Sequence, residues 1–277
     1  MMEFLHALQT QQFLRFALLA GVLAGIAGGI VGAYVVARRI SYMAGAVSHC
    51  VLGGIGAARY LQVTQNWSWL DPMYGAVASA LLSAIIIGLV SLRAKQREDT
   101  VIGALWAIGM AIGVVFVSMT PGYSGDLNTW LFGNILMASR EDLRLVAALD
   151  VITIVLAVGF YNRFMAVCFD AEFAAMRGLR VEMWFLLLLC LAALTIVALV
   201  KVVGIVLAIA LLTLPVAIAN TFTGVLWRVM LLGAGLCAVF TTVGLAFSYS
   251  TNLPAGAMIV LVAGAAYLLA AARGARA

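Results

Sequence analysis

The sequence predicts an all-α protein that crosses a membrane about eight or nine times. Hydrophobic residues make up 65% of the 277 residues and charged residues only 10%, whereas a soluble domain carries about 25% charged residues. The apolar residues also fall into repeated runs of about twenty, the length that a helix needs to cross the hydrocarbon core. A soluble fold of this length cannot bury so much apolar surface, so lipid must solvate part of it.

We expect nine membrane-spanning helices. The evidence is weakest for the second helix and for the boundary between the sixth and the seventh. The second segment is rich in small residues, and Lys201 lies where the sixth and seventh would separate, so eight or ten spans stay open. The whole chain, residues 1–277, is expected to form a single transmembrane domain. The predicted segments are 13–37, 42–62, 72–92, 100–119, 143–161, 183–201, 203–222, 227–247 and 254–272.

The distribution of basic residues predicts the orientation in a cell membrane, either an inner or a plasma membrane. Placing the N-terminus outside and the C-terminus in the cytoplasm puts eleven Lys and Arg residues inside and five outside, which agrees with the positive-inside rule. The start of the chain lacks the features of a cleaved signal peptide. The inner residues are Arg38, Arg39, Arg93, Lys95, Arg97, Arg163, Arg177, Arg180, Arg228, Arg273 and Arg276; the outer ones are Arg15, Arg59, Arg140, Arg144 and Lys201.

Glycines in the first segment predict a close helix contact. Gly21, Gly25, Gly28, Gly29 and Gly32 give three overlapping GxxxG pairs, a spacing that lets two helices approach closely in lipid. The contact could lie within one chain or between two copies.

Two connections are longer than a loop requires. The outer one, residues 121–142, contains the apolar run WLFGNILMA and predicts a short interfacial or re-entrant helix. The inner one, residues 161–182, contains FDAEFAAMRG. Acids at its start and Gly178 at its end are typical of helix caps, so it predicts a short cytoplasmic helix.

Several enzyme classes are excluded by missing motifs. The sequence has no GxxxxGK[ST], no HExxH and no GxSxG, so it lacks the usual nucleotide, zinc-protease and serine-hydrolase signatures. Its four cysteines are far apart and form no CxxC pair, which argues against a disulfide framework. The net charge of +5 records membrane topology and does not indicate a nucleic-acid partner.

Ionisable residues at membrane depth are the remaining candidates for function, because burying them is costly. His49 lies about two turns into the second segment, and imidazole is the commonest metal ligand. Asp150 is the one acid well inside a predicted span and is a weaker candidate ligand. The alternative for His49 is a packing role, satisfied by a backbone carbonyl or a neighbouring serine. The alternative for Asp150 is a packing hydrogen bond or an interfacial position.

Four stretches resemble the zinc/manganese ABC transporter permeases, the membrane subunits of metal importers. RRISYMAGAVSHCVLGGIGAARYL resembles the family's Ala-x-Ser-His segment, and DLNTWLFGNIL its outer-side segment. FDAEFAAMRGLRV resembles its inner Phe-Asp-x-Glu stretch. VVGIVLAIALLTLPVAIA with GLAFSYSTNLPAGAMIV resembles the C-terminal part. The order and spacing of the four cover the chain from about residue 14 to residue 270.

This resemblance implies an all-helical permease that is not itself an enzyme. It implies a homodimer, a cytoplasmic ATP-binding subunit that hydrolyses ATP, and an extracytoplasmic solute-binding protein that delivers the metal. It also assigns the inner helix as the coupling helix that docks on the ATPase. The residues concerned are Phe169, Asp170, Glu172, Phe173, Ala174 and Gly178.

The resemblance also makes His49 a ligand in the transport path, with one departure. Many members carry an aspartate four positions before the histidine, where the two side chains share a helix face. Here that position is Gly45. An acid from another span, such as Asp150, could compensate.

The resulting expectation is ATP-driven import of a divalent cation by alternating access, zinc first and then manganese or iron. No permanently bound cofactor is expected. The second reading is a permease for larger metal chelates such as haem, cobalamin or siderophores, whose path needs no protein ligand. The third is a stand-alone secondary transporter or an intramembrane enzyme, which the small number of intramembrane charges disfavours.

Overall fold

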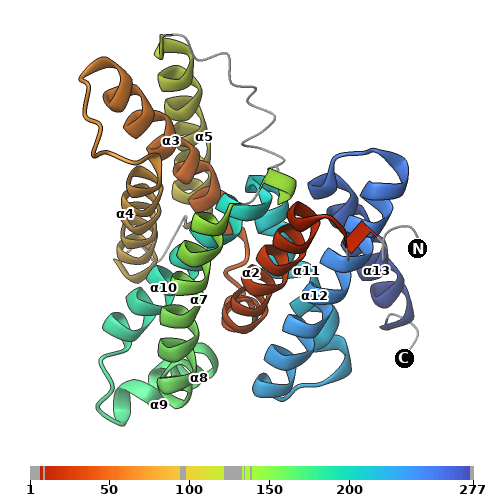
Figure 1. Ribbon diagram of the computed structural model, residues 1–277. Helices are drawn as coiled ribbons and strands as arrows, with labels where there is room; N and C mark the ends of the chain where they lie inside the picture. Colours follow the sequence, from red (N-terminus) through yellow and green to blue (C-terminus); the bar gives the residue numbers. More distant parts are fainter. Residues whose placement is uncertain are drawn as a thin grey trace. The chain divides into compact units, whose positions relative to one another are not determined.

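The computed structural model describes residues 7–8, 10–93, 98–121, 133, 135–137 and 139–274, and no β-strand occurs in these ranges. Figure 1 shows the arrangement of the helices. The helices are α2 (Gln12–Ala37), α3 (Tyr42–Thr64), α4 (Pro72–Arg93), α5 (Glu98–Met119), η1 (Ile135–Met137), α7 (Arg140–Gly159), α8 (Tyr161–Phe169), α9 (Ala171–Met176), α10 (Val181–Val203), α11 (Ile205–Phe222), α12 (Leu226–Thr251) and α13 (Ala255–Gly274).

The all-α prediction is confirmed, and each of the nine predicted segments corresponds to a long helix. Seven helices within the described ranges are long and apolar enough to cross a membrane, or eight if the bent pair α7–α8 forms one span. The remaining predicted segment is α3, which is helical but is not among those seven. The fifth prediction, 143–161, missed a 71° bend between α7 and α8.

The chain divides into two compact units. Unit 1 comprises residues 1–39, 127–160 and 198–277, and therefore holds α2, α7, α11, α12 and α13. Unit 2 comprises residues 40–126 and 161–197, and holds α3, α4, α5, α8, α9 and most of α10. The largest interhelical contacts are α2 with α12 in unit 1, and α3 with α5 and α4 in unit 2.

The glycines of α2 pack inside the chain, which decides between the two alternatives for the GxxxG pairs. A Cβ on Gly29 would collide with the backbone of Ala234 on α12, and a Cβ on Gly32 would collide with the carbonyl of Leu212 on α11. Such contacts require two helix backbones to touch, which only glycine permits. This face of α2 is therefore filled by α11 and α12.

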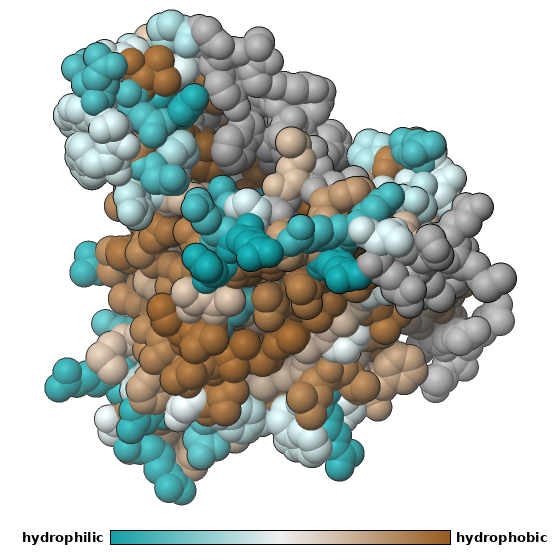
Figure 2. Space-filling view, viewed as in Figure 1, coloured by the Kyte–Doolittle hydropathy of each residue, from teal (hydrophilic) through white to brown (hydrophobic). Residues whose placement is uncertain are grey.

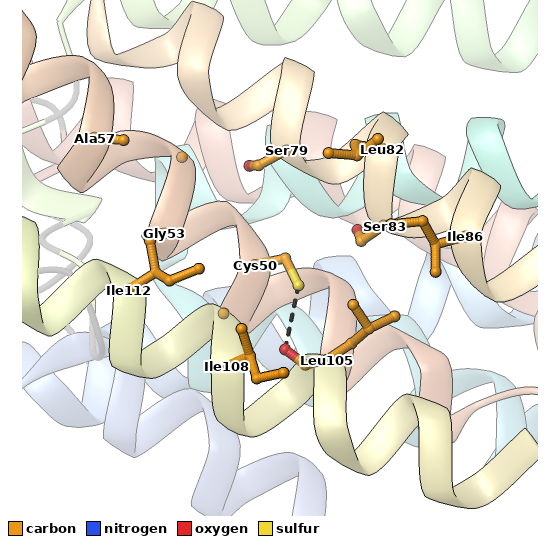
Figure 3. Close-up of a pocket in the computed structure, with 12 residues that line it drawn as sticks. Cys50, Gly53, Ala57, Ser79, Leu82, Ser83, Ile86, Leu105, Ile108 and Ile112 are labelled. Atoms are coloured by element: carbon orange, nitrogen blue, oxygen red, sulfur yellow. Dashed lines mark hydrogen bonds between the residues drawn. The ribbon is translucent and has the colours of Figure 1, made fainter.

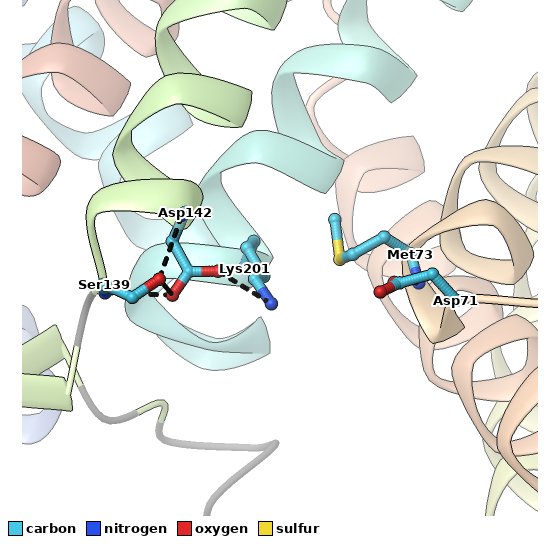
Figure 4. Close-up of polar contacts among 5 residues, drawn as sticks. All are labelled: Asp71, Met73, Ser139, Asp142 and Lys201. Carbon is cyan, nitrogen blue, oxygen red and sulfur yellow. Dashed lines mark hydrogen bonds and ion pairs between the residues drawn. The ribbon is translucent and has the colours of Figure 1, made fainter. Parts of the chain in front are cut away.

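The start of α7 is fixed by a capping box and an ion pair, which Figure 4 shows. The hydroxyl of Ser139 accepts a hydrogen bond from the backbone N–H of Asp142, and the Asp142 carboxylate accepts one from the backbone N–H of Ser139. That carboxylate also lies 3.0 Å from Nζ of Lys201 near the end of α10. The bounds of α10 include Lys201, and the boundary with α11 lies three residues later, at Gly204.

Gly204 lies at that boundary. Its φ of +83° takes the chain out of the helical conformation, and glycine is favoured there because this φ is costly for any residue with a Cβ. The predicted outer helix in residues 121–142 lies mostly outside the described residues. Within the described part, Ile135–Met137 forms a single 3-10 turn. Gly133, at φ +67°, has no room for a Cβ because the backbone of Val203 and Gly204 lies against it.

Pro215 interrupts the hydrogen-bond ladder of α11. Proline has no N–H, so the carbonyl of Leu211, four residues earlier, loses its helical partner. The thiol of Cys237 on α12 donates to that same carbonyl at 3.3 Å. This free cysteine therefore satisfies a backbone group that the proline leaves open.

The surface agrees with a lipid environment. Figure 2 shows large areas of apolar side chains on the visible face. Leu82 of α4, Val115 of α5 and Leu268 of α13 are all at least half exposed. Exposed apolar area of this extent is rare on soluble monomers, and it is what hydrocarbon chains would cover.

Candidate functional site

His49 lies on α3 in unit 2 and is held by its own helix. The side chain is only 9% exposed, and Nδ1 lies 2.8 Å from the carbonyl oxygen of Gly45. A carbonyl oxygen can only accept, so Nδ1 carries the proton, and in the neutral ring Nε2 carries the lone pair. A bond to a backbone carbonyl is what we expect if His49 has only a packing role. The same bond fixes the tautomer in which Nε2 can bind a metal ion.

Trp106 of α5 covers the imidazole and was missed by the sequence analysis. The two ring centroids lie 4.7 Å apart, with an angle of 35° between the planes. A single tryptophan in an apolar helix gives no signal of such a contact. The indole ring therefore forms one wall beside the candidate ligand.

Trp106 also explains the glycine that stands where many members of the family have aspartate. A Cβ on Gly45 would collide with the indole ring. No acidic side chain fits at position 45 while Trp106 keeps its place. Among the described residues, no group of three or more His, Cys, Asp and Glu side chains could hold a metal ion, so His49 has no neighbouring acid in such a cluster.

We expect Gly45→Asp to destabilise the protein, and to cost less stability in a Trp106→Ala background than in the wild type. Overpacking of a filled site costs about 1–3 kcal/mol, and removing the indole makes the room that the new carboxylate needs. Thermal unfolding in detergent measures the effect. Gly103→Asp on α5 is the matched control, because a Cβ there meets nothing within 4 Å. Equal destabilisation at positions 45 and 103 would contradict the steric explanation.

Cys50, the neighbour of His49 in the sequence, contacts α5. Its thiol donates to the carbonyl of Leu105 at 3.4 Å and lines a cavity of about 280 Å³ among α3, α4 and α5 (Figure 3). Ser79 and Ser83 of α4 are the polar side chains that line it with Cys50. The cavity is otherwise apolar and holds no carboxylate.

Asp150 lies on α7 in unit 1 and is 3% exposed. Neither carboxylate oxygen has a hydrogen-bond partner among the described residues. Thr153, one turn later on the same face, is 1% exposed and its hydroxyl is also unpaired there. The packing hydrogen bond that was one alternative for Asp150 is therefore not formed among the described residues.

The inner helix α9 has the caps that the sequence predicts. The Asp170 carboxylate accepts from the backbone N–H of Phe173 at 2.8 Å, and Glu172 lies in the first turn. Gly178 adopts φ +79°, and the N–H of Leu179 donates to the carbonyl of Ala174, which is typical of a glycine-terminated helix. The helix itself, Ala171–Met176, is shorter than predicted and follows a separate helix, α8.

The faces of α9 and its flanks differ in exposure. Ala174 is 1% exposed, whereas Phe169, Phe173 and Met176 are 63%, 46% and 79% exposed. The guanidinium of Arg177 lies 5.0 Å from the centroid of the Phe173 ring. The buried Ala174 therefore lies on the face of α9 that packs against the protein. The exposed side chains form an apolar patch beside the positive charge of Arg177.

Known proteins resemble the chain over nearly its whole length. The family profile described as "ABC 3 transport family" matches residues 10–274. A probable metal transport system membrane protein of Chlamydia pneumoniae is 39% identical over 84% of this chain and 80% of its own. The manganese transport system membrane protein MntC of Listeria monocytogenes is 34% identical over 97% of this chain and 93% of its own.

Solved structures agree with this comparison. PsaBC from Streptococcus pneumoniae, solved in complex with a Fab, matches with a TM-score of 0.85 and 31% identity, covering 97% of this chain and 94% of that one. A putative metal-chelate type ABC transporter in an inward-facing conformation matches with a TM-score of 0.72 at 14% identity, which shows a shared fold. The resemblance inferred from the sequence motifs is confirmed: the chain belongs to the ABC 3 transport family and is a membrane permease rather than an enzyme.

Proposed function

We propose that the chain is the permease of an ATP-driven importer for a divalent transition metal, with His49 as a ligand in the transport path. The family match over residues 10–274 carries this proposal. The geometry of His49 supports it, because the Gly45 carbonyl holds the ring with Nε2 as its free acceptor. A site with a single imidazole ligand binds weakly enough to release its ion, which transport requires.

We propose manganese as the first substrate and zinc as the second. The sequence alone favours zinc, because imidazole suits that ion. The named relatives from Listeria monocytogenes and Streptococcus parasanguinis are a manganese transport protein and a manganese import permease, which favours manganese here. Imidazole accepts both ions, so His49 alone does not discriminate between them.

We further propose that α9 docks on the separate ATP-binding subunit. The exposed Phe169, Phe173 and Met176 supply apolar contact area, and aromatic and methionine side chains are enriched in protein interfaces. The caps at Asp170 and Gly178 keep this short helix rigid, so that it can pass a rigid-body displacement to α8 and α10.

The Asp170 cap of α9 predicts an effect on the coupling between the permease and ATP hydrolysis. Asp170→Ala is expected to cost about 1 kcal/mol of local helix stability and to lower metal-stimulated ATP hydrolysis in the assembled transporter. Asp170→Asn, which keeps an oxygen acceptor, should retain most of the activity. Hydrolysis rates of the reconstituted complex measure this, and equal losses in both variants would show that the charge matters rather than the cap.

The remaining partners follow from the same assignment. We propose a homodimer of this chain, an extracytoplasmic metal-binding protein on the outer side, and a cytoplasmic C-terminus. Mass measurement of the detergent-solubilised complex tests the dimer. Accessibility of an added C-terminal tag in sealed vesicles tests the orientation.

Uptake by vesicles tests the function. The permease, its ATPase and its metal-binding protein are reconstituted together, and ATP-dependent uptake of radioactive Mn²⁺ and Zn²⁺ is measured singly and in competition. Manganese uptake that excess zinc inhibits only partly supports the proposal. ATP hydrolysis without uptake of either ion, but with stimulation by a haem or a cobalamin, would favour the chelate permease instead.

A further inference from the structure

The carboxylate of Asp150 and the hydroxyl of Thr153 lie one helical turn apart on α7 in unit 1. Their side chains are 3% and 1% exposed, and none of their three oxygens has a hydrogen-bond partner among the described residues. Buried polar groups are normally paired, and an isolated buried carboxylate is especially costly. Two such residues on one helix face indicate a site whose oxygen atoms lack a ligand or a hydrogen-bond donor.

The helix that packs along α7 supplies no counter-charge. Both α2 and α7 run in the same direction: the guanidinium of Arg140 lies over the Phe16 ring at the start, and the hydroxyl of Tyr34 donates to the carbonyl of Ala157 near the end. Between Phe16 and Tyr34, α2 contains no charged residue. Asp150 and Thr153 fall between these two contacts, beside an apolar stretch.

The chemistry of the oxygens identifies the missing partner. An ionised carboxylate can only accept hydrogen bonds, and a threonine hydroxyl offers lone pairs as well. With the carboxylate ionised, the group that completes the site is positive or a donor. Carboxylate and hydroxyl oxygens are ligands of hard cations such as Mg²⁺, Ca²⁺ and Mn²⁺.

The spacing suits one ion. Residues three apart on a helix lie on the same face, separated by about 4.5 Å along the axis. A cation held at about 2.0–2.6 Å from each oxygen can bridge two side chains at that separation. We propose that Asp150 and Thr153 form a hard-cation site whose protein ligands come wholly from unit 1. The identification of that cation as the transported Mn²⁺ rests on the proposed function.

Binding of Mn²⁺ to the solubilised full-length permease tests this site without transport. The probe is Mn²⁺ alone, followed by the loss of its aqueous electron paramagnetic resonance signal, in a His49→Ala background that removes the imidazole. Asp150→Asn is expected to weaken binding at least tenfold, the size of effect found at metal sites even for groups outside the coordination shell. Thr153→Val should weaken it about as much, whereas Thr153→Ser should retain it.

Thr241→Val is the matched control. Its hydroxyl is also buried and unpaired among the described residues, but Thr241 lies on α12 against Gly21. This variant removes a comparable group and should leave Mn²⁺ binding unchanged. Asp150→Asn removes a buried charge with almost no change in shape, so it should fold at least as well as the wild type.

The outcomes separate the site from the proposed function. Mn²⁺ binding that survives either Asp150→Asn or Thr153→Val overturns the site, even if the importer moves manganese through His49. Binding that both variants abolish supports the site, even if reconstituted vesicles import neither manganese nor zinc and the proposed substrate fails. A thermal stability that rises in Asp150→Asn without any change in Mn²⁺ binding would show a buried acid without a ligand.

Discussion

His49→Ala is expected to abolish ATP-dependent metal uptake while the permease still assembles with its ATPase. The ring donates from Nδ1 to the Gly45 carbonyl, so its other nitrogen is the group available to an ion. Loss of even a supporting partner of a metal ligand costs about 10–100-fold, and removal of the ligand should cost at least as much. Uptake by reconstituted vesicles, compared with the wild type at equal protein content, measures the loss.

Cys50→Ser provides the control for this result. Cys50 adjoins His49 on the same helix, but its side chain contacts the carbonyl of Leu105 and a neighbouring cavity. A serine keeps that hydrogen bond, so uptake should stay close to the wild-type rate. Equal uptake by His49→Ala and the wild type would make the histidine a packing residue, and loss of uptake in both variants would indicate a general defect of α3.

The second large effect is expected from Gly54→Val, which should prevent the normal packing of α3 on α4. A Cβ on Gly54 would collide with the carbonyl oxygen of Gly75, and a Cβ on Gly75 would collide with that of Gly54. Because backbone atoms occupy the space on both sides, rotamer changes cannot relieve the contact. We expect a loss of at least about 1–3 kcal/mol, seen as poor expression and a lowered thermal unfolding temperature in detergent.

Gly264→Val on α13 tests whether replacing any helical glycine by valine would destabilise the protein as Gly54→Val does. A Cβ at Gly264 meets nothing within 4 Å, so this variant carries the same change in helix propensity without the collision. Its unfolding temperature should lie near that of the wild type. Comparable losses at both positions would mean that propensity, and not the backbone contact, dominates.

Hydrophobic runs were enough to predict the helices, because in lipid a backbone must satisfy its own hydrogen bonds and helices do so within each run. The caps of α9 were also predictable, since Asp170 and Gly178 act on backbone groups only a few residues away. The bend between α7 and α8 was not, because the sequence across Gly159 to Tyr161 stays apolar and contains no proline.

The candidate site was predictable only in part. The sequence identified His49 and the missing acid at Gly45, but the reason for the glycine lies in Trp106, about sixty positions away. Contacts between distant residues leave no trace in local spacing. Asp150 stood out as an acid inside an apolar run, whereas Thr153 did not, because a threonine in a helix usually bonds to its own backbone.

The bond between Cys237 and Leu211 has a consequence for how α11 bends. Pro215 removes one rung of the helix ladder, and the replacement donor is a thiol, which forms only weak hydrogen bonds. We therefore expect this turn of α11 to bend more easily than the unbroken turns beside it. A change in the angle between the two halves of α11 would then be taken up at the Leu211 carbonyl, which the Cys237 thiol on α12 holds by a weak hydrogen bond.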